Sequence, residues 1–389
     1  MGASSSDPIP ELPRGRRLMI HRSLATLGIP AMVIAVGSMS MLMSQASQRA
    51  RNAATDPQTK AATPSVPPPG AAAAKTSGFR TPWGDPDLQG VWNDATSTPL
   101  QRPTGVASKD VLNDAEAEEF QDQLAGHLSR DRRDGGSEVD ANRAYNEHWM
   151  DARRLKITGD HRTSLIVDPE DGKIPPLVPL SAERQKQSDE RAAALARFNA
   201  GMPNTYFDFE LPIRCITRTD MPPYMPTIYN NDFQIVQSPG YVVIAPEMIH
   251  SARIIPLDGR PHVGKNLHLW LGDSRGHWDG NTLVLETTNF RPDSDIFRAA
   301  DPATFRLTER LTRMDARTIN YEYTVEDPHT WTRPWTVRIP WTRIDPAEQM
   351  YEYACHEDNY DESHFLMGAR ERERRGEVVQ PIPHLPSVQ

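Results

Sequence analysis

The 389-residue chain has a net charge of −9, with 24% charged and 38% hydrophobic residues, a mixture typical of a soluble globular protein. An acidic body without a Lys/Arg cluster excludes nucleic acid as a partner and argues against binding to anionic lipid. The 35 prolines are about twice the average share, so long uninterrupted helices are not expected.

Residues 1–46 contain the three parts of a secretory signal. Several arginines precede an uncharged apolar run from Leu24 to Met43, and Ser44-Gln45-Ala46 supplies small residues at a cleavage site. The pair Arg16-Arg17 leaves the twin-arginine route open beside the general secretory route. An uncleaved membrane anchor is the alternative to cleavage, and it would be the chain's only contact with a membrane. Both alternatives predict a periplasmic or secreted body.

Residues 47–78 are rich in Ala, Thr, Pro and Ser, including Pro67-Pro68-Pro69. Such a segment cannot bury enough apolar surface to fold, so we expect a disordered linker. The remaining residues, 79–389, are expected to form one domain.

Two or three helices are expected in this domain. Asn113 and Glu116 form a capping box that opens a polar helix ending near Leu128. Ser181 caps a second helix over residues 182–198. A shorter helix is expected over residues 363–374. The apolar stripes of the first two helices are thin, which predicts positions on the surface of a larger core.

The rest of the domain has the pattern of short antiparallel strands. The expected strands cover residues 164–167, 233–237, 242–245, 252–256, 282–288, 305–313, 318–325, 335–342 and 350–354. Asp171-Gly172, Asp258-Gly259 and Asp279-Gly280 are candidate hairpin turns. This pattern predicts a mainly β fold, an antiparallel barrel or sandwich with two or three peripheral helices. Gly90-Val91-Trp92 near its start favours a lipocalin-like barrel.

Four phrases of the sequence are similar to those of a family of secreted bacterial proteins. They are Pro82 to Trp92 (PWGDPDLQGVW), Arg162 to Pro169 (RTSLIVDP), Gly272 to Trp278 (GDSRGHW) and Tyr353 to Glu357 (YACHE). Together they extend over essentially the whole body of the chain. The resemblance implies a single family domain and an exported location, and it implies no activity.

Motifs with a known mechanism are missing from the sequence. It contains no Gly-x-Gly-x-x-Gly after a strand, no phosphate loop, no His-Glu-x-x-His, no Cys-x-x-Cys and no Gly-x-Ser-x-Gly. Nucleotide-dependent chemistry and the common zinc-protease and serine-hydrolase designs are therefore not expected, and no cofactor is predicted.

Polar segments beside strands are the candidates for catalysis. His250 is the expected general acid or base, Asp160 its orienting carboxylate and Arg162 the group that holds an anion. Three further candidates lie in similar segments: Glu247, Asp273 and Arg275. Aromatic residues expected to line a substrate pocket are Tyr145, Trp149, Tyr229, Phe233 and Trp270.

Four of these polar residues also have a structural explanation. Asp273 and Arg275 can form an ion pair that stabilises a turn, Asp160 can hold a tight turn after Gly159, and His250 can be a core histidine with its hydrogen bonds satisfied. The sequence leaves both explanations open.

The chain has two cysteines, Cys215 and Cys355. In an oxidising compartment an even number favours a disulfide, which would close a long loop. The alternative is that Cys355, His356 and Glu357 act as a nucleophile or as metal ligands. Adjacent strand residues point to opposite faces, which disfavours that alternative.

A divalent-metal site built from scattered histidines is a further alternative. Its candidate ligands are His250, His262, His268 and His277. They lack a short ligand spacing, so the pattern gives this site little support.

Three functions are compatible with the sequence. The first is an exported enzyme that performs cofactor-free acid–base chemistry, as a lyase, isomerase or hydrolase, on a small apolar or aromatic compound. The second is a non-catalytic periplasmic binding protein for a hydrophobic ligand. The third is a structural or interaction module of the cell envelope. We favour the enzyme because titratable residues gather in short segments beside strands.

Overall fold

The computed structural model describes residues 78–106, 109–128, 155–227, 229–249, 251–294, 296–297, 300–345 and 349–377. The chain divides into the units Met1–Ala72 and Ala73–Gln389, and all described residues belong to the second. The signal segment and nearly all of the expected linker lie outside the described residues, so both remain predictions.

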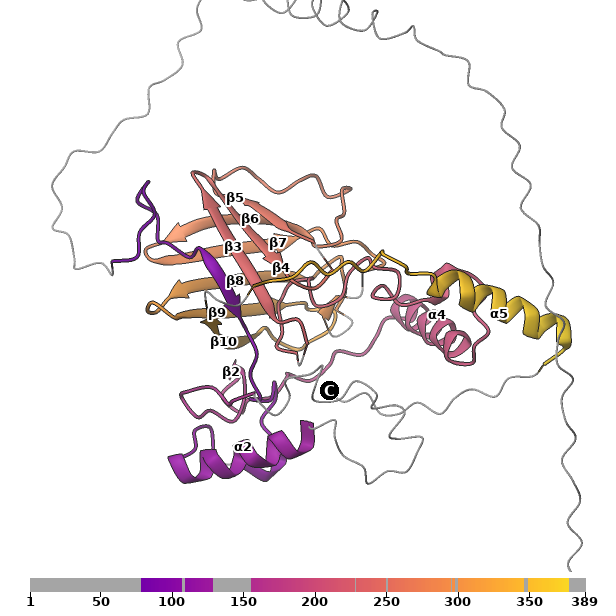
Figure 1. The fold of residues 1–389 in the computed structure, drawn as a ribbon, viewed down its shortest axis with the longest axis horizontal. Coiled ribbons are helices and arrows are strands. Elements are labelled where there is room, and N and C mark those ends of the chain that lie inside the picture. Colours follow the sequence, from indigo (N-terminus) through magenta and orange to yellow (C-terminus); the bar gives the residue numbers. More distant parts are fainter. Residues whose placement is uncertain are drawn as a thin grey trace, which may run out of the picture. The chain divides into compact units, whose positions relative to one another are not determined.

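A ten-stranded antiparallel sheet forms the centre of the described unit (Figure 1). Its strands are β1 Gly90–Asn93, β2 Ile166–Asp168, β3 Asp232–Ser238, β4 Tyr241–Pro246, β5 Arg253–Pro256, β6 Asp273–Asp279, β7 Thr282–Thr288, β8 Arg306–Arg313, β9 Thr318–Glu326 and β10 Trp335–Arg343. The spatial order is β5-β4-β3-β1-β10-β9-β8-β7-β6, and β2 pairs with β10. The early strand β1 therefore joins two antiparallel meanders.

The two ends of this order, β5 and β6, come together through side chains. Arg253 on β5 donates to Ser274 on β6, with 2.9 Å between Nη2 and Oγ. Gly276 on β6 allows the close approach, because an added Cβ would lie 2.6 Å from Leu257 Cδ2 and 3.1 Å from Ile255 Cγ2. The sheet is thus a nearly closed barrel, which confirms the predicted fold class.

Alternating side chains fill the barrel interior. On β9 the inward positions are Ile319, Tyr321, Tyr323 and Val325, all fully buried. The inward positions of β10 are Trp335, Val337, Ile339 and Trp341. The period-2 pattern of the sequence thus produces one buried and one wetter face.

A polar network crosses the same interior. Arg253 and Glu309 form an ion pair with 2.6 Å between Nη2 and Oε2. Glu309 also accepts a hydrogen bond from Tyr321 at 2.8 Å, and Arg253 donates to Thr287 at 3.1 Å. Burial, joined by the nearby Glu309 charge and opposed by Arg253, raises the pKa of Tyr224 to about 12.

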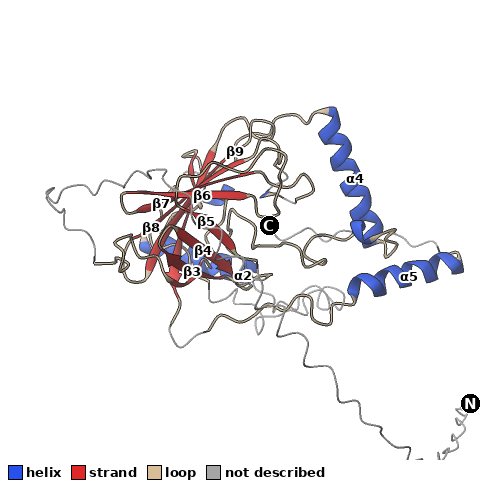
Figure 2. Cartoon of the chain, turned by 90° about the horizontal axis from the view of Figure 1, so that it is seen from above, coloured by secondary structure: helices blue, strands red, loops and turns tan. Residues whose placement is uncertain are grey.

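The three expected helices are present as α2 Asp114–Leu128, α4 Ala182–Asn199 and α5 Asp361–Arg375. The capping box is formed: Asn113 Oδ1 accepts from the Glu116 amide at 3.0 Å, and Glu116 accepts from the Asn113 amide at 3.2 Å. Figure 2 shows α4 and α5 outside the sheet. They contact each other through Phe198 and Phe365, whose ring centroids are 5.3 Å apart.

Cys215 and Cys355 form a disulfide, with their Cα atoms 5.7 Å apart, as the even cysteine count predicts. The bond joins the segment after α4 to the segment before α5. Within the described ranges, no helix combines the length and the apolar character needed to span a membrane.

Some local predictions are wrong. Residues 350–354 form no strand. Asp171-Gly172 does not connect two paired strands, and Asp258-Gly259 begins a long β5–β6 connection in place of a tight hairpin. Only Asp279-Gly280 lies at a tight hairpin, between β6 and β7, where Asp279 pairs with Thr282.

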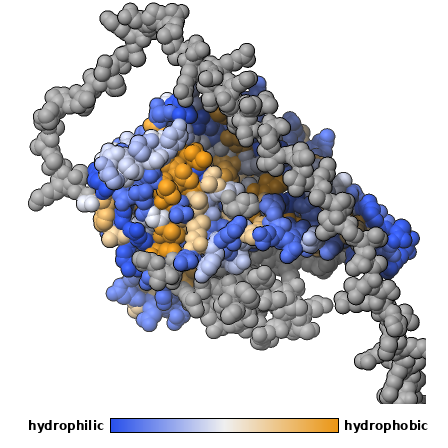
Figure 3. Space-filling view, turned by 45° about the horizontal axis from the view of Figure 1, so that its top comes forward, coloured by the Kyte–Doolittle hydropathy of each residue, from blue (hydrophilic) through white to orange (hydrophobic). Residues whose placement is uncertain are grey.

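The outer surface of β3–β5 carries apolar side chains. Val236 pairs across the strands with Val243, and Val243 pairs with Ile254. Val236 and Ile254 are exposed. Figure 3 shows apolar side chains gathered among polar ones on one face of the described unit.

Candidate functional site

The structure does not describe three of the residues expected to act in a site. His250, the expected general base, and the pocket aromatics Tyr145 and Trp149 lie outside the described residues. Their roles remain predictions.

Asp160 and Arg162 do lie together. The Nε atom of Arg162 is 3.0 Å from Asp160 Oδ1, and both residues line a cavity of about 510 Å³. Burial opposes ionisation of Asp160, but hydrogen bonds from Thr158 and Arg162 hold its pKa below the ordinary value. Asp160 is therefore ionised and engaged with Arg162.

Glu247 follows β4 at an end of the barrel where carboxylates gather. Burial, followed by the nearby charge of Asp232, raises the pKa of Glu247. Asp94, which directly follows β1, is fully buried, and neither carboxylate oxygen has a hydrogen-bond partner among the described residues. Burial raises its pKa well above the ordinary value, and the charge of Asp232 adds to this effect.

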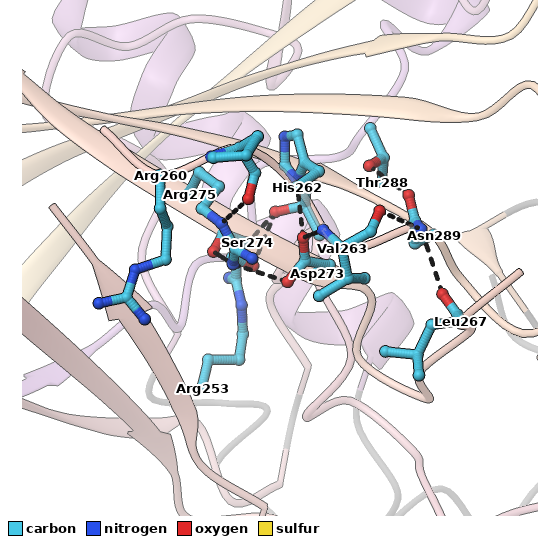
Figure 4. A network of polar contacts seen from close by, with 12 residues as sticks. Arg253, Arg260, His262, Val263, Leu267, Asp273, Ser274, Arg275, Thr288 and Asn289 are labelled. Atoms are coloured by element: carbon cyan, nitrogen blue, oxygen red, sulfur yellow. Dashed lines mark hydrogen bonds and ion pairs between the residues drawn. The ribbon is translucent and has the colours of Figure 1, made fainter. Parts of the chain in front are cut away.

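Asp273 and Arg275 belong to a network that fixes the β5–β6 connection (Figure 4). Asp273 accepts hydrogen bonds from Arg275 Nη1 at 2.6 Å, His262 Nδ1 at 2.9 Å and the Val263 amide at 3.0 Å. The buried carboxylate thus has three donors. This arrangement matches the structural explanation of Asp273 as a residue that holds a turn.

Asn289 completes this network from the other side of the connection. Its Nδ2 group lies within hydrogen-bonding distance of the carbonyl groups of Val263, Gly264 and Leu267, at 3.3, 3.2 and 3.1 Å (Figure 4). The residue that follows Leu267 is His268. The network therefore sets the position from which His268 reaches the cleft described below.

The described pocket aromatics do not form one group. Phe233 is buried in the barrel and stacks on Trp341 at 4.7 Å. Trp270 lies under the guanidinium of Arg291 at 4.4 Å. Tyr229 is partly exposed, and its carbonyl accepts a hydrogen bond from Thr227.

A cleft of about 460 Å³ brings together titratable groups that the sequence leaves unconnected. Its lining combines α4, the β5–β6 connection and the segments before β8 and after β9. His329 Nδ1 lies 2.8 Å from Asp301 Oδ2. Burial opposes ionisation of Asp301, but the hydrogen bond from His329 and the amide of Ala303 lower its pKa overall.

The ionised carboxylate assigns the tautomer of His329. A carboxylate only accepts hydrogen bonds, so Nδ1 carries a proton, and in the neutral ring Nε2 presents a lone pair. The ring is 57% exposed, so this lone pair is accessible from the cleft. A histidine oriented in this way is suited to act as a general base.

Asp327 holds both members of the pair in place. It is only 2% exposed and accepts hydrogen bonds from the backbone amides of Asp301 at 2.7 Å and His329 at 3.0 Å. Thr304 donates to the same carboxylate at 2.6 Å. One buried side chain thus fixes the separation of two residues that lie 28 positions apart.

Arg184, in the first turn of α4, connects that helix to the same segment. Its Nη1 donates to the His329 carbonyl at 2.5 Å and its Nη2 to Thr330 Oγ1 at 3.1 Å. Its Nε lies 4.0 Å from Asp301 Oδ2. The cation supports the ionised form of Asp301, in agreement with the lowered pKa.

His268 supplies a second imidazole to the cleft. Its Nδ1 lies 3.1 Å from the Phe290 carbonyl, an acceptor, so Nδ1 again carries the proton and Nε2 is left with a lone pair. Of the other candidate metal ligands, His262 contacts Asp273, His277 is exposed on β6, and His250 lies outside the described residues. The described ranges contain no group of three His, Cys, Asp or Glu arranged to hold a metal ion.

Sequence reasoning missed Asp301, His329 and Arg184, and it considered His268 only as a metal ligand. Two local signals were present: Asp327-Pro328-His329 directly follows a strong strand pattern, and Ser181 places Arg184 in the first helical turn. Neither signal reveals the partner, because Asp301 and His329 meet only through tertiary folding. No protein-family model and no curated protein matches the chain.

Proposed function

We propose that this chain is an exported enzyme that performs cofactor-free acid–base chemistry on a small apolar or aromatic compound, with His329 as the proton-transferring group. The observation that carries the proposal is the 2.8 Å contact between His329 Nδ1 and ionised Asp301 at a cleft. The pair leaves Nε2 ready to take a proton.

The chemistry follows from the arrangement of the pair. His329 Nε2 removes a proton from a substrate carbon or from a water molecule, and Asp301 stabilises the resulting imidazolium ion. His268 is the second proton donor or acceptor of the same cleft. Proton abstraction from carbon gives a lyase or isomerase, and activation of water gives a hydrolase. Positioned general acid–base groups typically contribute about 10²–10⁴-fold to a rate.

The residues that line the cleft suit a compact, partly apolar substrate. Five of the apolar lining residues are Phe290, Pro179, Pro292, Pro302 and Pro328. Proline rings have fixed backbone φ angles, so much of the wall is rigid and preformed. The lining has two carboxylates, Glu183 and Asp301, against the single cation of Arg184, and this small negative excess disfavours a multiply anionic substrate.

Export is supported by the disulfide. Disulfides form and persist in oxidising compartments, and the Cys215–Cys355 bond fits the secretory signal expected in residues 1–46. The carrier alternative has less support, because large side chains such as Trp92, Tyr321 and Trp341 occupy the barrel interior where a hydrophobic ligand would bind.

The test is a turnover screen of the purified protein against small aromatic and alicyclic esters, lactones and carbonyl compounds. We expect His329→Gln and Asp301→Asn to reduce turnover by at least about 100-fold. His364→Gln, on the outer helix α5, is the matched control and should retain full activity. Turnover that survives His329→Gln, or saturable binding of these compounds without any conversion, would contradict the proposal.

A further inference from the structure

A second cavity contains a buried arginine that forms no ion pair with any described residue. Arg102 is only 8% exposed, and its guanidinium donates to Thr163 Oγ1 at 3.1 Å and to the Glu170 carbonyl at 3.0 Å. Both acceptors are neutral, and no carboxylate of the described residues forms an ion pair with Arg102. Arginine side chains are rarely buried unless they are paired, because desolvation of the charge is costly.

One end of this guanidinium faces the cavity. Arg102 Nη1 has no hydrogen-bond partner among the described residues, yet it is not one of their fully buried unpaired polar atoms. Arg102 lines the cavity of about 510 Å³ that also contains Asp160 and Arg162. Its free Nη1 is therefore accessible from that space and is suited to bind an anionic group.

Two further arginines line the same cavity, and both are held rigidly. Arg162 donates through Nε to Asp160 and through Nη1 to the Arg338 carbonyl at 3.2 Å. Arg338 donates through Nε and Nη2 to Glu322 at 3.0 and 2.8 Å. Arg162 Nη2 and Arg338 Nη1 have no partner in the described part of the chain. Little side-chain entropy is then lost when these donors bind a ligand.

The charges around the cavity allow one negative charge on a ligand, placed at Arg102. Asp160 pairs with Arg162 and Glu322 pairs with Arg338, so Arg102 is the arginine of this lining that has no ion pair among the described residues. Asp110 and Glu170 also line the cavity and bring it to three carboxylates against three arginines, so a second negative charge on the ligand would be repelled. A guanidinium matches the planar geometry of a carboxylate. The apolar side chains of Val111, Ile166 and Val167 provide contacts for an organic substituent.

We propose that this cavity binds the carboxylate of a small organic anion, with Arg102 as the principal charge partner and Arg162 and Arg338 as supporting donors. The ion pair of Asp160 and Arg162 is part of the site, and the anion-holding role that the sequence assigns to Arg162 falls mainly to Arg102 in this proposal. The proposal does not depend on the cleft around His329.

Isothermal titration calorimetry of the purified full-length protein with sodium benzoate tests the site, with inorganic phosphate as the second anion. We expect one benzoate per chain, and phosphate binding at least 10-fold weaker. Arg102→Gln should weaken benzoate binding at least 10-fold. Arg102→Lys, which keeps the charge and loses the planar fork, should have an intermediate effect. Arg310→Gln, at an exposed arginine paired with Asp279, is the matched control and should bind as the wild type does.

If Arg102→Gln fails to fold, as judged by circular dichroism, Arg162→Gln replaces it, and we expect at least a 5-fold loss of affinity. Three results would overturn the proposal. They are absence of saturable benzoate binding to the wild type, unchanged affinity in a folded Arg102→Gln or Arg162→Gln variant, and tighter binding of phosphate than of benzoate. Because His329→Gln leaves this cavity intact, benzoate affinity should be unchanged in that variant even if the proposed enzymatic function fails.

Discussion

Arg253 and Glu309 form an ion pair inside the barrel, with side chains that are 2% and 0% exposed. Their strands, β5 and β8, are not neighbours in the sheet, so the pair spans the interior. Two charges removed from water stabilise a fold only while they remain paired, since either one alone is left in a medium of low polarity.

The first prediction concerns this pair. Glu309→Gln should lower the free energy of unfolding by about 3–5 kcal/mol, because it leaves the charge of Arg253 buried and uncompensated. The double variant Arg253→Met/Glu309→Leu removes both charges and should regain much of that loss. Urea denaturation followed by tryptophan fluorescence measures both values. A double variant that is less stable than Glu309→Gln would show that the pair itself is strongly stabilising.

Asp94 predicts a distinct pH dependence of stability. Its folded-state pKa is raised by burial, so the folded protein binds this proton more tightly than the unfolded chain does. The resulting stability is fully present below the unfolded pKa of about 3.9 and is lost as the pH rises through the folded pKa. Asp94→Asn should remove this loss, so that its stability relative to the wild type increases between pH 4.5 and pH 8.

The same urea titrations at three pH values measure the effect of Asp94→Asn. Asp122→Asn, at an exposed position of α2, is the control and should leave the pH profile of the wild type unchanged. Parallel profiles for the wild type and Asp94→Asn would contradict a neutral, buried Asp94.

The third prediction concerns Gly272, at the start of β6. It has a φ of +70°, and an added Cβ would lie 2.8 Å from the Thr288 carbonyl oxygen, a backbone atom that cannot easily move. Gly272→Ala should therefore destabilise the protein by about 1–3 kcal/mol. Gly280→Ala is the matched control, because its φ of +61° is similar but its Cβ would meet nothing within 4 Å. Equal thermal shifts of the two variants would show that backbone conformation alone accounts for the cost.

The fourth prediction concerns the disulfide, which joins residues separated by 140 positions. In the chain-entropy model, the removal of such a cross-link frees the unfolded chain and costs about 5 kcal/mol. Cys215→Ala/Cys355→Ala should therefore unfold at a markedly lower urea concentration than the oxidised wild type. The wild type in reducing agent should behave like the variant. A reductant that leaves the wild-type midpoint unchanged would argue against a stabilising bond.

The elements that could be predicted are those specified by nearby residues. Asn113 and Ser181 mark helix starts because a cap satisfies amides only two or three residues away. The alternation of Ile319, Tyr321, Tyr323 and Val325 predicts β9 because it directly reflects the two faces of a strand. Residues 350–354 have a similar apolar–polar pattern but form no strand, since a strand also needs a partner that the local sequence does not reveal.

The candidate sites also divide into contacts between residues near in sequence and contacts that only the fold creates. Asp160 and Arg162 are two positions apart, so their contact could be expected from sequence. The pair formed by Asp301 and His329 depends on the β8–β9 hairpin and on Asp327, which holds both amides. The buried state of Arg102 depends on its contact with Thr163, 61 positions away. Contacts between residues so far apart in the chain cannot be predicted from local sequence patterns.

The barrel is expected to open first at the junction of β5 and β6. The described residues of these two strands are joined by side-chain contacts such as Arg253 to Ser274, in place of a backbone ladder. Backbone amides directed toward this junction are therefore expected to exchange with deuterium through small, local fluctuations, while those of β8 and β9, paired on both sides, exchange only when the domain unfolds as a whole. The barrel would then be mechanically weakest along this junction, which contains Arg253 of the buried ion pair with Glu309.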